Sequence, residues 1–146
     1  MEQNPSTTED RKLFLIGEYD ALLDDKNRIL VCAVFRNEIL ECGFDSSLIC
    51  RVAKNRVARL YPTRYYRQMI AKRESTLVPG DEEEKFNDQY YGTVFPLNWD
   101  SQGRVGIHEK IIKRAIMGRE LTLVGTGDHV AIWNRDEWER RVQALG

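Results

Sequence analysis

Two short stretches place an acid and an arginine at the same spacing, and they are the strongest candidates for chemistry in this chain. "DDKNR" (24–28) and "DSQGR" (100–104) each put an aspartate four residues before an arginine. Such an aspartate can accept hydrogen bonds from the amides of its own turn, which fixes the loop. The residue before each arginine, Asn27 or Gly103, tolerates a left-handed backbone. The arginine is then held on a rigid platform, suited to bidentate recognition of phosphate or guanine.

One such corner alone has a simpler interpretation. The aspartate and arginine could form an ion pair that only pins the turn, or the arginine could pair with another subunit. Two copies in matching positions, with Lys26 beside the first, favour a repeated contact with a partner instead. The candidate binding residues are Asp24, Lys26, Arg28, Asp100 and Arg104.

The rest of the sequence gives little support for a catalytic or metal-binding site. The cysteines and histidines are Cys32, Cys42, Cys50, His108 and His129. An odd number of cysteines without a CxxC pair predicts free thiols, buried or half-buried. The histidines share no metal-ligand spacing with an acid or cysteine and have no evident orienting partner. The glycines at 125 and 127 join two strands and lack a third glycine, which argues against a nucleotide loop. We expect no enzyme, metal or cofactor.

The segments that contain the corners repeat one layout. After each corner the apolar residues alternate, which predicts a half-buried strand, and then recur four apart, which predicts a short helix. Each copy continues with a hairpin, over residues 47–62 in one and 120–134 in the other, and closes with a helix. Pro62 is suited to a helix start, and Asn134 and Glu137 have the spacing of a capping box.

Charge is distributed unevenly along the chain. Residues 13–73 carry 11 basic and seven acidic side chains, whereas residues 74–85 carry one basic and five acidic. The net charge of −1 therefore hides a basic surplus in the first half. The stretch "ESTLVPGDEEEKFND" (74–88) combines Pro-Gly with the acidic run, which predicts a linker.

The composition is that of a globular domain. The chain is 42% hydrophobic and 31% charged. Residues 1–12 are polar and predict a disordered tail, and the apolar run at 13–16 is too short for a signal peptide or a membrane span, so we expect a cytoplasmic protein. A hairpin of two strands is marginally stable alone, so the two copies should interlock with each other and with neighbouring chains.

Four segments together resemble the MraZ family of bacterial transcriptional regulators, along roughly residues 13–146. They are "GEYDALLDDKNRILV", "LYPTRYY", "FPLNWDSQGRVGI" and "ELTLVGTGDHVAIWNRDEWERRV". The resemblance implies an α+β fold with a mainly β core: a tandem of swapped-hairpin SpoVT/AbrB-like units of the double-ψ β-barrel type, with packed helices. The implied boundaries are a tail at 1–12, a first unit at 18–65, a helix and acidic linker at 66–93, a second unit at 94–137 and a C-terminal helix at 138–146.

The resemblance also implies a function. Members form homo-oligomeric rings, associate with the nucleoid and bind repeated DNA sites upstream of the division and cell-wall operon, so the expected role is a sequence-specific repressor. The corners are the DNA-facing surface: Asp24, Arg28, Asp100 and Arg104, supported by Lys26.

The sequence departs from the family pattern at three positions. Asn27 stands where the family has glycine, and Cys32 and His108 stand where it has proline. The alternative function is a protein-interaction or scaffold module on the same fold, with the DNA surface weakened or lost.

Overall fold

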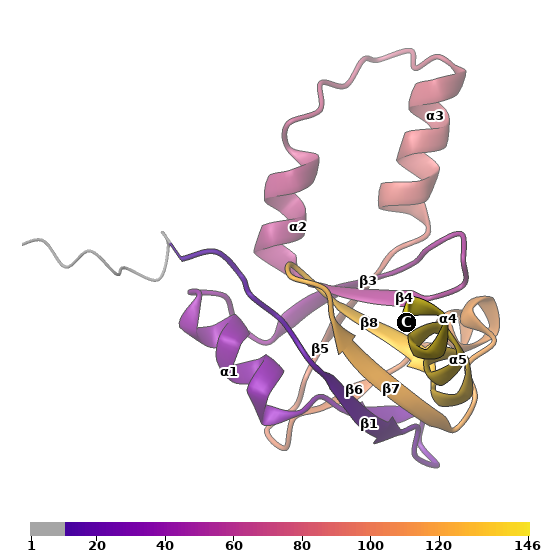
Figure 1. The fold of residues 1–146 in the computed structure, drawn as a ribbon. Coiled ribbons are helices and arrows are strands. Elements are labelled where there is room, and N and C mark those ends of the chain that lie inside the picture. The colour runs from indigo at the N-terminus through magenta and orange to yellow at the C-terminus, as the bar shows by residue number, and fades with distance from the viewer. Residues whose placement is uncertain (1–10) are drawn as a thin grey trace, which may run out of the picture.

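The structure is a computed structural model that describes residues 11–146. The tail predicted for residues 1–12 therefore lies outside the described residues, apart from Arg11 and Lys12. The elements of the first half are β1 (Glu18–Leu22), β2 (Arg28–Leu30), α1 (Ala33–Glu41), β3 (Ser47–Val52), β4 (Ala58–Pro62) and α2 (Thr63–Ile70). Two segments follow, α3 (Asp81–Asn87) and the π-helical η2 (Asp88–Gly92). The second half contains β5 (Phe95–Asn98), β6 (Arg104–Gly106), α4 (Glu109–Ala115), β7 (Glu120–Gly125), β8 (Val130–Asn134) and α5 (Arg135–Leu145). Figure 1 shows their arrangement.

The two halves interlock in one six-stranded sheet, in the order β1-β7-β8-β4-β3-β5. The strand that precedes each corner pairs with the hairpin of the other half: β1 is antiparallel to β7, and β5 is antiparallel to β3. The hairpins meet where β4 pairs with β8. Each half thus completes the sheet of the other, which confirms that they interlock. Association with neighbouring chains stays a prediction.

The strands that follow the corners pair with each other, outside the six-stranded sheet. β2 and β6 form a separate antiparallel ribbon in which Ile29 lies opposite Val105. Both side chains are buried, whereas their neighbours on the ribbon point outward. This pairing places the two corners close together although they are far apart in sequence.

The larger of two hydrophobic clusters serves both halves. The buried cluster joins residues of the strands with Phe35 and Ile39 of α1 and Ile111 of α4. The expected α+β class with a mainly β core is confirmed. The double-ψ form of the barrel stays a prediction.

The second part of the predicted linker is helical. Gly80 is the N-cap of α3, and the acids at 81–84 form its first turn. Negative charge is favourable there because the amides at a helix N-terminus carry partial positive charge. The acidic run that indicated a linker therefore begins a helix. None of its side chains is buried.

The capping box predicted at the start of α5 is wrong, although Asn134 is its N-cap residue. The Asn134 side chain instead binds the turn after α4: its Oδ1 accepts from the Gly118 amide at 2.7 Å, and its Nδ2 donates to the Ile116 carbonyl at 2.9 Å. Ile116 ends α4 in a left-handed conformation, with φ of 48°. Asn134, at the start of α5, thus stabilises the end of α4.

Candidate nucleic-acid interface

The first corner is closed by its aspartate, as the sequence predicts. One carboxylate oxygen of Asp24 accepts the amides of Lys26 at 2.9 Å and of Arg28 at 2.8 Å. The other accepts the Arg28 Nε–H at 2.9 Å. Asn27 has φ of 58°, the left-handed conformation expected of it. The carboxylate therefore holds the turn with one oxygen and aims the arginine with the other.

The second corner repeats this geometry. Asp100 accepts the amides of Gln102 and Arg104, both at 2.9 Å, and the Arg104 Nε–H at 3.2 Å. Gly103 has φ of 83°. The ion pair thus does both things that the sequence suggested: it pins the turn, and it orients the arginine.

The hydrogen bonds perturb both carboxyl groups. The Arg28 amide, and then the Arg28 side chain, hold the pKa of Asp24 below its ordinary value. The Arg104 amide does the same most strongly for the pKa of Asp100. Both carboxylates are therefore ionised at neutral pH, and each neutralises part of the charge of its arginine.

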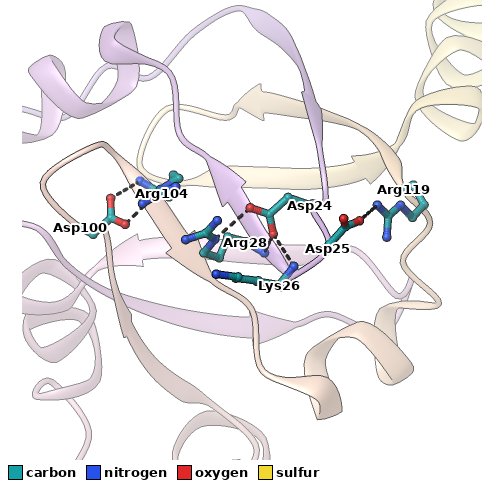
Figure 2. Close-up of polar contacts among 7 residues, drawn as sticks. All are labelled: Asp24, Asp25, Lys26, Arg28, Asp100, Arg104 and Arg119. Carbon is teal, nitrogen blue, oxygen red and sulfur yellow. Dashed lines mark hydrogen bonds and ion pairs between the residues drawn. The ribbon is translucent and has the colours of Figure 1, made fainter.

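The two arginines emerge on the same face of the β2–β6 ribbon. Arg28 lies opposite Gly106, and Arg104 lies opposite Leu30. In Figure 2 the arginines lie next to each other, each with its own aspartate on the outer side. Their side chains are 30% and 33% exposed, which leaves them accessible but partly supported. The candidate residues, including the exposed Lys26, therefore form one surface, which we call the corner surface.

Reciprocal backbone bonds join the corners. The Val31 amide, after the first corner, donates to the Gly103 carbonyl at 2.9 Å. The Ile107 amide, after the second, donates to the Asn27 carbonyl at 2.7 Å. Asn27 and Gly103 thus each accept an amide from the strand of the other copy, so the two corners are held as a single rigid unit.

A third turn has the same backbone form as the corners but contains no aspartate. The β3–β4 turn, residues 53–57, closes with the same pair of backbone bonds: the Ala53 amide donates to the Val57 carbonyl, and the Arg56 amide donates to the Ala53 carbonyl. Arg56 also has a positive φ, 67°. This turn has alanine in place of aspartate, and Asn55 Oδ1 accepts the Val57 amide at 3.2 Å instead. The distinctive role of Asp24 and Asp100 is therefore to orient an arginine.

Two further arginines border the corner surface and were missed from the sequence. Arg119, after α4, pairs with Asp25 at 2.8 Å, so that acid does not stand unpaired beside the first tip. Arg36 of α1 donates to the Val31 carbonyl at 2.8 Å and lies against Gly103, where a Cβ would come within 2.6 Å of its guanidinium. No local motif links these residues to the corners, because tertiary folding alone brings them there.

The histidine of the β7–β8 turn has partners that the sequence did not reveal. His129 Nδ1 lies 2.7 Å from Asp128, and its Nε2 lies 2.8 Å from both Thr126 Oγ1 and Arg59 Nη1. The prediction of no orienting partner is therefore wrong. Arg59 donates to Nε2, however, so this nitrogen is not free to act as a base toward Thr126. Burial also lowers the pKa of His129.

The cysteines are free thiols, as predicted. Burial raises the pKa of Cys42 to about 11 and of Cys50 to about 12, which keeps both protonated. Within residues 11–146, no group of three or more histidine, cysteine or acidic side chains is placed to hold a metal ion. None of the described helices is both long and apolar enough to cross a membrane.

The fold and the corner surface define a class of protein: two interlocked copies of one strand–corner–strand–helix–hairpin layout that present paired arginine tips. Comparison with known proteins shows which family the chain resembles. The family model described as "MraZ protein, putative antitoxin-like" matches residues 92–145. A protein of Clostridium tetani named transcriptional regulator MraZ is 27% identical over 124 residues, 85% of this chain and 84% of that protein. One of Neisseria gonorrhoeae with the same name is 28% identical over 131 residues, 88% of this chain and 86% of the relative. The resemblance to the MraZ family is thus confirmed, and it extends over both copies.

Proposed function

We propose that this protein is a DNA-binding transcriptional regulator whose corner surface contacts the double helix. The observation that carries the proposal is the pair of oriented arginines. Each uses Nε to bind its own aspartate. No hydrogen bond joins the η nitrogens of Arg28 or Arg104 to another residue within 11–146. A guanidinium held in this way offers its outer edge to a phosphate or to the acceptor atoms of guanine.

The charge of the chain favours several weak contacts with DNA over one strong contact. The net charge of the chain is −1, and the arginines of the corners are accompanied by aspartates. A single subunit would therefore bind DNA weakly, because phosphate contacts supply most of the affinity. We infer that the protein acts as a homo-oligomer, expected to be a ring, in which several corner surfaces bind repeated sites and multivalency raises the affinity.

The relatives add the biological setting. They are named transcriptional regulators. For this chain we propose the same role: a cytoplasmic, nucleoid-associated repressor of the division and cell-wall operon that binds specific sites upstream of it. The operon and the direction of regulation come from the family resemblance.

The test is the salt dependence of DNA binding. Arg28→Ala and Arg104→Ala should each weaken binding, and each should lower the slope of log affinity against log salt by about one for every phosphate contact that a subunit loses. Fluorescence anisotropy with the DNA upstream of the protein's own operon measures both quantities. Lys54→Ala is the control, since it removes one exposed cation from the third turn, which is part of neither corner.

An unchanged affinity and slope for both arginine variants would refute the role of the corners. Absence of binding by the unaltered protein at low salt would favour the alternative, a protein-interaction module on the same fold.

A further inference from the structure

The most exposed apolar side chains lie at the tip of a projecting arm. The arm consists of α2, the connection 71–80, α3 and η2, and Figure 1 shows its two helices extending from the sheet, with the connection at the far end. Leu77 and Val78, in that connection, are 101% and 87% exposed. Adjacent large apolar side chains this exposed are unfavourable in water unless a partner covers them.

The tip is a formed structure. The Glu83 carboxylate accepts the Thr76 amide and the Thr76 hydroxyl, each at 3.0 Å. This clamp joins the start of α3 to the residue immediately before Leu77. The two apolar side chains are therefore presented in a defined position, next to the acidic first turn of α3.

The base of the same arm contains an apolar groove. It has a volume of about 510 Å³, a size suited to a few side chains. Its main lining residues are Ile49, Tyr66, Ile70, Tyr90, Tyr91 and Val94. The Tyr66 hydroxyl donates to the Tyr90 carbonyl at 2.7 Å, which fixes one wall to the other.

The groove and the tip are complementary in charge. Arg67 lines the groove, and the guanidinium of Arg51 lies 4.4 Å from the Tyr90 ring centroid. Residues 51–70, from the end of β3 to the end of α2, carry six basic side chains and no acidic one. Residues 71–85, which contain the tip, carry five acidic side chains and three basic ones, a net negative charge. An apolar pair beside acids thus matches an apolar groove beside arginines.

The tip cannot fill the groove of its own chain in this arrangement. The seven residues of α3 separate them by about 10 Å at 1.5 Å per residue, and the Thr76–Glu83 clamp holds the connection at the far end. We propose that Leu77 and Val78 of one copy dock in the groove of a second copy, so that the arms join subunits. This inference specifies the interface of the oligomer in the proposed function.

The test compares the mass in solution of three full-length variants, without DNA. Leu77→Ser combined with Val78→Ser should reduce the oligomer to smaller species, measured by light scattering after size exclusion. Leu145→Ser is the matched control: Leu145 is 72% exposed, but it lies on α5, away from the arm. Its mass should equal that of the unaltered chain. Circular dichroism should show that every variant is folded, since these side chains support no core.

A mixing experiment then identifies the partner surface. Ile70→Glu alters the groove and leaves the tip intact, so this variant alone should also have a reduced mass. Mixed with the tip variant, whose groove is intact, it should form mixed species that neither forms alone. A monomeric unaltered chain, an unchanged mass in the tip variant, a reduced mass in the Leu145 control, or a mixture that forms no mixed species would each overturn the proposal. Because no DNA is present, failure here is distinguishable from failure of the corners to bind DNA.

Discussion

At the scale of single residues, the two corner aspartates perform separable tasks. Oδ1 of Asp24 accepts two backbone amides, and Oδ2 accepts the arginine Nε–H. The third turn forms without an aspartate, so the second task distinguishes the corners. An asparagine can reproduce the first task through its carbonyl oxygen. It cannot reproduce the second, because its amide nitrogen is a donor.

Asp24→Asn should therefore lower the melting temperature slightly at neutral pH while the protein stays folded. The pKa of Asp24 is lowered on folding, so its stabilisation is fully present above the ordinary value of 3.8 and is lost as the pH falls through the folded-state pKa. The difference in melting temperature between the unaltered protein and the variant should shrink across that acid range. Asp25→Asn is the control, since Asp25 is outside these bonds. A difference that is independent of pH would contradict the assignment.

At the scale of elements, α1 and α4 both begin where the family pattern has proline. Their N-cap residues, Cys32 and His108, have φ of −60° and −63°, close to the angle of a proline ring. The backbone of each bend therefore keeps the proline-like angle without the proline. His108 contributes something more, because its Nδ1 accepts the Lys110 amide at 3.1 Å.

Cys32→Pro should stabilise the protein by about 0.4–1 kcal/mol, because proline restricts the unfolded chain at an angle that the folded chain already adopts. His108→Pro should gain less or lose stability, because it removes a capping bond whose loss costs roughly 0.5–2 kcal/mol. Urea unfolding of both variants measures the difference. Equal effects at the two positions would show that the His108 cap contributes nothing.

At the scale of the whole molecule, the interlocked sheet should make the two halves unfold together. The three tryptophans, at 99, 133 and 138, all lie in the second half, so their fluorescence reports on that half. Ile39 lies in α1 of the first half and is buried in the shared core. Its effect on the tryptophan signal therefore tests the coupling between halves.

Ile39→Ala should destabilise the protein by roughly 2–5 kcal/mol, the usual loss for a buried side chain of this size. The unfolding midpoint by tryptophan fluorescence should shift as far as the midpoint by circular dichroism. A fluorescence midpoint that does not move would mean that the second half folds independently.

Much of the local structure was predictable because it depends on neighbours in sequence. Alternation and a spacing of four residues identified the strands and helices of the two copies, but α3 was predicted as a linker. The Asp-x-x-x-Arg spacing identified both corners with their left-handed residues. Predictions failed where a side chain had a stronger partner far along the chain. Asn134 binds the end of α4 rather than its own helix, and His129 is engaged by Arg59 from β4.

By itself, the sequence determined the two corners, the repeated layout and the family resemblance, because turns and strands follow from local chemistry. Only the tertiary structure decided that Arg28 and Arg104 share one face, since that follows from the pairing of β2 with β6 across the two halves. It also placed Arg36 and Arg119 at the edge of that face and set the apolar tip of the arm apart from its groove. Long-range pairing and packing set these distances, and no spacing within a single stretch encodes them.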